Sequence, residues 1–351
     1  MTLGLIRSRV SSLMPLSPFL KRSLDAAVAA AMRTALPLTG LGDGPRHHLI
    51  EVTLEAIEGM NRGLGGDYLQ FDPVLLWSLK PHGGAGAERA DERGMMNGPF
   101  AMAMHPEARP VRVLIAGASL FIEGSPTLFR LVRERLESDR PDIELINAAV
   151  PGYTAVQVVH HLDRLFPFYR PTHVFACTIW TDCWPRHLLD DPLALRIMSD
   201  PPWRGGLAAE RLGRAFLYAR WRLRHHGPRV PLNEYRRLWR FLIRYCRARG
   251  CQPLFFTLPI AFDIPPMHRY LRLHRLQWLP ERYARYMGVF RAVTAGHPIC
   301  DCSCALTGGA EQYFESDGQH LNALGKERVA DLMADFFLKN IPDGAAGRSE
   351  G

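Results

Sequence analysis

Short apolar runs alternate with longer segments of helical periodicity from residue 111 onward. The apolar runs, which we expect to form buried strands, are 111–116, 143–146, 173–179, 253–258 and 298–302. The helical segments are 125–136, 155–166, 232–249, 280–295 and 323–338. Strands that alternate with helices form a parallel sheet that is covered on both faces. The pattern therefore predicts an α/β fold with a mostly parallel, five-stranded sheet.

The segments outside this alternation set the expected domain boundaries. Residues 42–110 are rich in glycine, proline and turn residues, so residues 1–110 are expected to form a leader and an irregular extension. The main domain is expected over residues 111–340, followed by a flexible tail at residues 341–351. Residues 183–231 interrupt the alternation and are either a lid that binds substrate or a solvated basic helix with an aromatic packing face. The tryptophans and arginines that this segment carries include Trp184, Trp203, Trp221, Arg204, Arg211, Arg214, Arg220, Arg222 and Arg224.

Composition narrows the class of protein. The 351 residues are 47% hydrophobic and 22% charged, as in ordinary soluble globular proteins. The formal net charge is +8, and it comes mainly from arginines that are spread through the expected helices. No block of Lys and Arg, zinc-finger, P-loop or RNA-recognition pattern accompanies this charge. We therefore expect no dedicated nucleic-acid binding, although the charge suits an anionic substrate.

The cysteines and the N-terminal residues indicate which cofactors and which cellular compartment to expect. Seven cysteines, an odd number, favour a reducing compartment over a disulfide framework. Cys300, Cys302 and Cys304 lack the second cysteine pair of a structural zinc site, so we expect neither a metal nor another cofactor. Residues 1–40 hold no uncharged stretch long enough to span a bilayer. We expect a cytoplasmic protein, with a peripheral amphipathic helix at the N-terminus as the alternative to a plain leader.

One serine lies at an expected strand end. The first apolar run stops at Gly117, Ala118 and Ser119, and a helical pattern resumes a few residues later. In parallel α/β sheets the catalytic groups lie at the carboxyl ends of the strands. Ser119 is therefore either a nucleophile or the cap of the next helix.

A carboxylate and an imidazole lie near the other end of the chain. Asp317 and His320 are three residues apart on an expected loop before the last helix. This spacing lets the carboxylate reach one ring nitrogen while the other points outward, as the base of a serine triad requires. The alternative is an Asp-Gly turn beside a surface histidine.

Two further strand ends complete the expected cleft. Gly152 lies in a turn after the second strand, where its N–H can face an oxyanion, and Thr181 and Asp182 follow the third strand. A serine, a glycine, a polar side chain and an Asp-x-x-His pair at neighbouring strand edges favour one catalytic site.

The order of these motifs resembles the SGNH (GDSL-like) hydrolase superfamily. The matching elements are Gly-x-Ser, Asn-x-x-x-x-Gly, a polar residue before Asp182, and a late Asp-x-x-His-Leu-Asn-x-x-Gly, and the resemblance covers roughly residues 70–338. It implies a three-layer α/β/α flavodoxin-like domain that hydrolyses or transfers acyl esters without a metal or organic cofactor. It also implies that Ser119 is the nucleophile, that Asp317 and His320 complete the triad, and that Gly152 donates to the oxyanion.

The chain departs from this family pattern at several positions. Ala118 replaces the aspartate before the nucleophile, and the following threonine is lost while its glycine shifts to Gly124. Thr181 stands where the family has an oxyanion-hole asparagine, and Ile179 stands where it has a glycine. Loss of one oxyanion donor lowers a rate by about 100- to 1000-fold.

We therefore expect a serine esterase or acyl transferase that uses Ser119, His320 and Asp317. The N–H groups of Ser119 and Gly152 and the hydroxyl of Thr181 are the expected oxyanion donors. The expected substrate is a small-molecule, carbohydrate or lipid ester that carries an anionic part. The substitutions at positions 179 and 181 support a rival interpretation, in which the fold is kept as a non-catalytic binding or scaffold module.

Overall fold

The structure is a computed structural model that describes part of the chain. The described residues are 44–84, 90–91, 94–95, 111–117, 119–186, 191–199, 227–306 and 309–342. All of them except Gly44 and Pro45 belong to one compact unit, which comprises residues 46–201 and 224–351. The expected leader, most of the expected lid and the expected tail from residue 343 lie outside the described residues. None of the described helices is both long enough and apolar enough to cross a bilayer.

Five parallel strands form the central sheet, in the order β4-β3-β5-β6-β7. Their bounds are β3 Val111–Gly117, β4 Ile143–Asn147, β5 His173–Cys177, β6 Gln252–Thr257 and β7 Ile299–Asp301. β3 and β5 are buried along their whole length. The carboxyl ends of parallel strands lie at one edge of a sheet, so the residues that follow β3, β4, β5 and β6 gather there. The predicted five-stranded parallel sheet is confirmed.

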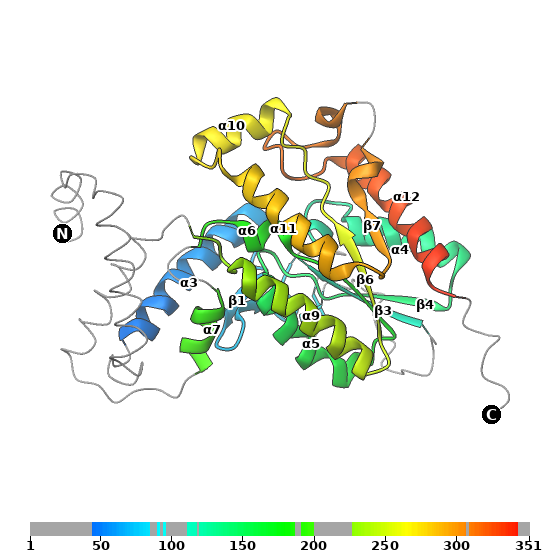
Figure 1. Ribbon diagram of the computed structural model, residues 1–351, viewed down its shortest axis with the longest axis horizontal. Coiled ribbons are helices and arrows are strands. Elements are labelled where there is room, and N and C mark those ends of the chain that lie inside the picture. Colours follow the sequence, from blue (N-terminus) through cyan, green and yellow to red (C-terminus); the bar gives the residue numbers. More distant parts are fainter. Residues whose placement is uncertain are drawn as a thin grey trace. The chain divides into compact units, whose positions relative to one another are not determined.

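Aromatic side chains of β6 reveal how helices cover both faces of the sheet. The main helices are α4 Leu128–Asp139, α5 Ala155–Tyr169, α9 Leu232–Ala248, α11 Leu279–Thr294 and α12 Ala323–Asn340. Phe255 and Phe256 are neighbours, so their side chains point to opposite faces. The Phe256 ring packs on Phe175, which contacts Phe337 of α12, whereas the Phe255 ring packs on Trp239 of α9. Since α4 packs on α12 and α5 packs on α9, a layer of helices covers each face (Figure 1).

One strand is shorter than predicted, and this changes the setting of Thr181. The strand expected over residues 173–179 ends at Cys177, and the short helix α6 (Ile179–Cys183) follows. Thr181 therefore lies on a helical turn beyond the strand end. The other short helices are η3 Ser119–Phe121, α7 Asp191–Ser199, α10 Pro265–Leu273, η4 Cys302–Ala305 and η5 Ala310–Tyr313.

The described part of the N-terminal extension contains regular structure where we expected irregular chain. Helix α3 (Gly44–Leu64) precedes an antiparallel hairpin of β1 (Leu69–Asp72) and β2 (Leu76–Leu79). The turn of the hairpin is stabilised by the Asp72 carboxylate, which accepts the backbone N–H groups of Val74 and Leu75. A short carboxylate side chain at the start of a turn commonly bonds to the following backbone in this way.

The hairpin is attached to the edge of the sheet where β4 ends. The Trp77 indole N–H donates to the carbonyl oxygen of Pro151 at 2.9 Å, and the Tyr153 hydroxyl donates to the carbonyl oxygen of Trp77 at 2.7 Å. The Gln157 amide donates to the carbonyl oxygen of Leu75 at 2.7 Å. The extension thus contacts the turn that holds Gly152, one of the expected site residues.

Candidate active site

Ser119 is the first residue of η3, directly beyond the carboxyl end of β3. η3 is fixed by Phe121, which is fully buried and packs edge-on against Phe175. Gly117, the last residue of β3, allows a close approach to β5, because a Cβ at this position would stand 3.0 Å from the carbonyl oxygen of Cys177. The strand end therefore presents one half-buried serine at the edge of the sheet.

The helix-cap alternative for Ser119 does not hold. The next helix, α4, begins at Leu128 rather than at residue 125 as predicted, and its N-cap is Thr127. The Thr127 hydroxyl accepts the N–H of Arg130 at 3.2 Å. The hydroxyl of Ser119 has no hydrogen-bond partner within the described part of the chain, so a capping role does not explain it.

Asp317 and His320 form an ion pair on the loop before α12. Asp317 Oδ2 lies 2.6 Å from His320 Nδ1, and Asp317 Oδ1 accepts the backbone N–H groups of Gln319 and His320 at 2.9 and 3.1 Å. Burial would raise the pKa of Asp317, but these hydrogen bonds and the charge of His320 outweigh it and lower the pKa to about 2. Gly318 has φ +73°, and a Cβ there would stand 2.6 Å from the backbone nitrogen of Met267. The Asp-Gly turn and the Asp–His pair therefore occur together.

The residues after His320 hold this loop in place. Asn322 is the N-cap of α12, where its Oδ1 accepts the N–H of Gly325 at 3.0 Å and its Nδ2 donates to the carbonyl oxygen of Gln312 at 2.8 Å. Gly325 lies directly against the carbonyl oxygen of Tyr313, where a Cβ would collide. The Asn-x-x-Gly part of the motif thus positions His320 from the C-terminal side.

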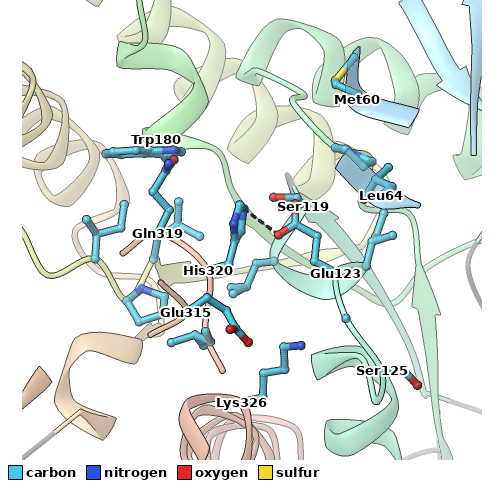
Figure 2. A pocket seen from close by; sticks show the side chains of 18 of the residues that line it. Met60, Leu64, Ser119, Glu123, Ser125, Trp180, Glu315, Gln319, His320 and Lys326 are labelled. Carbon is cyan, nitrogen blue, oxygen red and sulfur yellow. Dashed lines mark ion pairs between the residues drawn. The ribbon is translucent and has the colours of Figure 1, made fainter. Parts of the chain in front are cut away.

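A second carboxylate, which the sequence did not identify, binds His320. Glu123 Oε2 lies 2.7 Å from His320 Nε2 (Figure 2), the ring nitrogen that a triad directs at its serine. Burial would lower the pKa of His320, but the hydrogen bonds and charges of Asp317 and Glu123 outweigh it and raise the pKa to about 10. His320 is thus an imidazolium at neutral pH. No motif marks Glu123, which follows Ser119 in the segment that departs from the family pattern.

Ser119, Glu123 and His320 line one cavity of about 880 Å³ (Figure 2). Ser119 follows β3, Pro151 follows β4, Trp180 follows β5 and Leu258 follows β6, so the cavity lies at the carboxyl edge of the sheet. Helix α3 contributes Met60 and Leu64 to an apolar wall. The charged residues of the lining are Glu123, Arg130, Glu315, His320 and Lys326. The structure brings Ser119 and His320 to the same cavity from opposite ends of the main domain.

Gly152 lies in the turn after β4 with φ +73°, in the left-handed region that favours glycine. Its carbonyl oxygen accepts a hydrogen bond from Arg229 Nη1 at 2.7 Å. Among the described residues, neither the N–H of Gly152 nor that of Ser119 donates to a protein acceptor. Pro151, one residue earlier, is the part of this turn that lines the cavity.

Thr181 does not line the cavity, and its hydroxyl is bound elsewhere. The hydroxyl oxygen lies within donating distance of the carbonyl oxygens of Tyr153 and Thr178, and the residue is buried. Its neighbour Trp180 is the residue of α6 that lines the cavity. A role for Thr181 as a third oxyanion donor stays a prediction.

We expect the Thr181→Val variant to separate a structural from a catalytic role. Valine keeps the shape of threonine but leaves the carbonyl of Tyr153 without its donor, so the free energy of unfolding should fall by about 1–2 kcal/mol. Urea unfolding measures this change. Ester hydrolysis should fall less than tenfold, because the hydroxyl is bound to carbonyls; a loss of about 100- to 1000-fold would instead identify Thr181 as an oxyanion donor.

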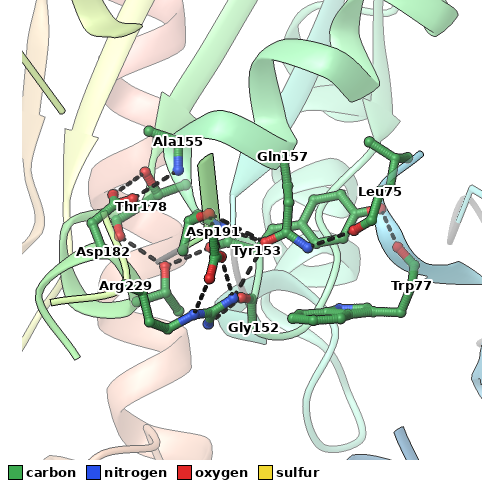
Figure 3. Close-up of polar contacts among 12 residues, drawn as sticks. Leu75, Trp77, Gly152, Tyr153, Ala155, Gln157, Thr178, Asp182, Asp191 and Arg229 are labelled. Carbon is green, nitrogen blue, oxygen red and sulfur yellow. Dashed lines mark hydrogen bonds and ion pairs between the residues drawn. The ribbon is translucent and has the colours of Figure 1, made fainter. Parts of the chain in front are cut away.

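A buried polar network supports the turn at Gly152 (Figure 3). Arg229 forms an ion pair with Asp191 at 2.7 Å, and the two side chains are 7% and 8% exposed. The same guanidinium donates to the carbonyl oxygen of Gly152 and, at 3.3 Å, to Gln157 Oε1. Gln157 continues to the hairpin through Leu75. The network therefore ties together α7, the segment before α9, the Gly152 turn and the N-terminal hairpin.

The expected lid is described only in part. Of the tryptophans and arginines singled out for it in the sequence, Trp184 belongs to the described residues, and its ring packs on Trp180 with centroids 5.7 Å apart. The thiols of Cys300 and Cys302 lie 3.9 Å apart. Over the described ranges, no three His, Cys, Asp or Glu side chains are grouped so that they could hold a metal ion.

Comparison with known proteins finds similar solved structures. No family model matches the chain, and no curated protein matches it. A lipase/acylhydrolase from Enterococcus faecalis is 18% identical with a TM-score of 0.44, covering 65% of this chain and 95% of that chain. The psychrotrophic esterase EstA from Pseudoalteromonas sp. is 17% identical with a TM-score of 0.41, covering 65% and 97%. A GDSL-like lipase from Bacteroides thetaiotaomicron is 11% identical with a TM-score of 0.38, covering 66% and 89%. Proteins of the GDSL type, which the sequence motifs resemble, recur among the similar structures.

Proposed function

We propose that the chain is a serine hydrolase of esters or an acyl transferase, in which Ser119 is the nucleophile, His320 the base and Asp317 the residue that orients it. The observation that carries this proposal is that Ser119 and the Asp317-bound His320 line one cavity. A hydroxyl at a strand end, an imidazole, and a carboxylate on the Nδ1 side of that imidazole are the groups that acyl transfer to a serine requires.

The reaction follows from these groups once His320 Nε2 is unprotonated and faces Ser119. Nε2 takes the proton of the Ser119 hydroxyl as Oγ attacks the ester carbonyl carbon, while Asp317 stabilises the imidazolium that forms. The N–H groups of Ser119 and Gly152 are the proposed oxyanion donors. The Thr181→Val variant tests whether the Thr181 hydroxyl is a third donor. His320 then returns the proton to the leaving alcohol oxygen. Water or a second alcohol attacks the acyl-Ser119 ester, which gives hydrolysis or transfer.

The lining of the cavity supports a substrate with two chemically different parts. Met60, Leu64 and Trp180 offer apolar surface to an acyl chain or another apolar group. Arg130 and Lys326 suit an anionic group on the same substrate. We propose a small-molecule, carbohydrate or lipid ester, and this chemistry requires no metal or organic cofactor.

A second candidate function is a binding or scaffold module that does not turn over an ester. It is favoured by the contact between Glu123 and His320 Nε2, because this contact takes the nitrogen that the base would use. A module of this kind would bind ester-like ligands in the cavity without reacting with them.

The decisive experiment is covalent labelling with fluorophosphonate probes of several sizes between pH 7 and pH 10. The Ser119 oxygen is expected to displace fluoride and form a bond to phosphorus, and peptide mass spectrometry should place the adduct on Ser119. Ser119→Ala and His320→Ala should not be labelled, whereas Ser138→Ala, which removes an exposed serine of α4, should be labelled like the parent chain. Folded protein that reacts with no probe at any of these pH values would support the binding module instead.

A further inference from the structure

The imidazole of His320 is bound by a carboxylate at each ring nitrogen. Asp317 Oδ2 lies 2.6 Å from Nδ1, and Glu123 Oε2 lies 2.7 Å from Nε2. An ionised carboxylate only accepts hydrogen bonds, so each of these short contacts needs an N–H on the ring. Both nitrogens of His320 must therefore carry a proton while both contacts persist, and a doubly protonated ring cannot accept the proton of Ser119.

Glu123 is held beside His320 by its own backbone, and the next residue, Gly124, lies against α12. Its N–H donates to the carbonyl oxygen of Ser119 at 3.2 Å, which fixes the carboxylate near the nucleophile. Gly124 follows with φ +75°, and a Cβ there would collide with the Lys326 ammonium. The Glu123 side chain is only 23% exposed, so the carboxylate belongs to the cavity rather than to the solvent.

The charged groups around His320 come from several elements. Glu123 faces it from the segment after η3, and Asp317 faces it from its own loop. The other charged residues of the cavity are Glu315 on the same loop, Arg130 on α4 and Lys326 on α12. The two carboxylates in direct contact with the ring outweigh the effect of burial and raise the pKa of His320.

We propose that Glu123 is a positioning residue that occupies His320 Nε2 and holds the ring in its protonated form, so that the site gains its base only at alkaline pH. When the ring loses its Nε2 proton to the solvent, the lone pair of Nε2 faces a negatively charged oxygen. That contact is repulsive, so the Glu123 carboxylate moves away. Nε2 then becomes available to the Ser119 hydroxyl. The effect on the rate rests on the proposed function, whereas the effect on the protonation of His320 does not.

The first test measures the protonation of His320 directly, without any activity. The ring-proton NMR signal of His320, identified by its loss in His320→Gln, is followed between pH 5 and pH 11 in the full chain. The parent chain should titrate well above pH 7. In Glu123→Gln, which keeps the shape of the side chain, the midpoint should fall by about one to three pH units. Glu123→Ala should change it in the same direction.

The matched control is Glu311→Gln, which removes an exposed carboxylate of η5 outside the cavity and should leave the midpoint within about 0.3 pH units. A midpoint near 6.5 in the parent chain, or the same midpoint in parent and Glu123→Gln, would overturn the proposal.

The second test measures the pH profile of phosphonate labelling at Ser119. The parent chain should react faster as the pH rises, and Glu123→Gln should reach the same plateau at a lower pH. At pH 7 its labelling rate should exceed that of the parent by roughly 10-fold or more. Profiles that coincide would overturn the proposal. If the NMR midpoints differ as expected but no variant is labelled at any pH, then the proposed function fails while the role of Glu123 in the protonation of His320 stands.

Discussion

Ser119→Ala is expected to reduce kcat for ester hydrolysis by roughly 10⁶-fold, and His320→Ala by a similar factor, as in other serine triads. In the proposed mechanism the hydroxyl forms the covalent bond and the imidazole moves its proton, so loss of either leaves only binding and the oxyanion donors. Asp317→Ala should reduce kcat less, by roughly 10⁴-fold, because the aspartate orients the base without reacting. The double variant Ser119→Ala/His320→Ala should be no slower than either single variant.

These rates are measured with a p-nitrophenyl ester at the alkaline pH where His320 is neutral, and circular dichroism confirms that each variant folds. Ser138→Ala is the matched control and should retain the parent kcat. Activity that survives in Ser119→Ala would assign the nucleophile to another residue and contradict the proposed triad.

Arg229→Met is expected to lower the free energy of unfolding by about 3–5 kcal/mol. Methionine replaces the apolar stem of the arginine but leaves the Asp191 carboxylate, whose side chain is 8% exposed, buried without its cation. It also removes the donor that holds the carbonyl oxygen of Gly152. Urea unfolding at pH 7 measures the change.

The control is Arg237→Met, which breaks an ion pair of nearly the same length, 2.8 Å to Glu234, in which the arginine is 75% exposed. An ion pair at the surface contributes little to stability, so the free energy of unfolding should change by no more than about 0.5 kcal/mol. Arg229→Met/Asp191→Leu should regain part of the stability lost in Arg229→Met, because no unpaired charge stays buried. Equal losses in Arg229→Met and Arg237→Met would contradict the supporting role of the network.

The parts of the fold that follow from local pattern were predictable from the sequence. The five strands of the sheet and the five main helices overlap the ranges that apolar runs and helical periodicity predicted, although β5 ends earlier and α4 begins later than expected. Burial of a strand or of one helix face is recorded in the spacing of its own residues. The contact between Asp317 and His320 was predictable for the same reason, since the two residues lie three positions apart within one turn.

The N-terminal hairpin was not predictable in the same way. Its turn residues suggested irregular chain, yet Trp77 and Leu75 bind the segment around Gly152, which lies far away in the sequence. Two short strands have little stability of their own, and these distant contacts stabilise them.

The sequence by itself determined the sheet, the serine at the end of β3 and the Asp–His pair. Only the tertiary structure decided what surrounds them: it placed Glu123 on His320 Nε2 and bound the Thr181 hydroxyl to backbone carbonyls. The physical reason is that the strength of an electrostatic contact depends on distance and burial. Both are set by how segments from opposite ends of the domain meet, and spacing along the chain does not encode them.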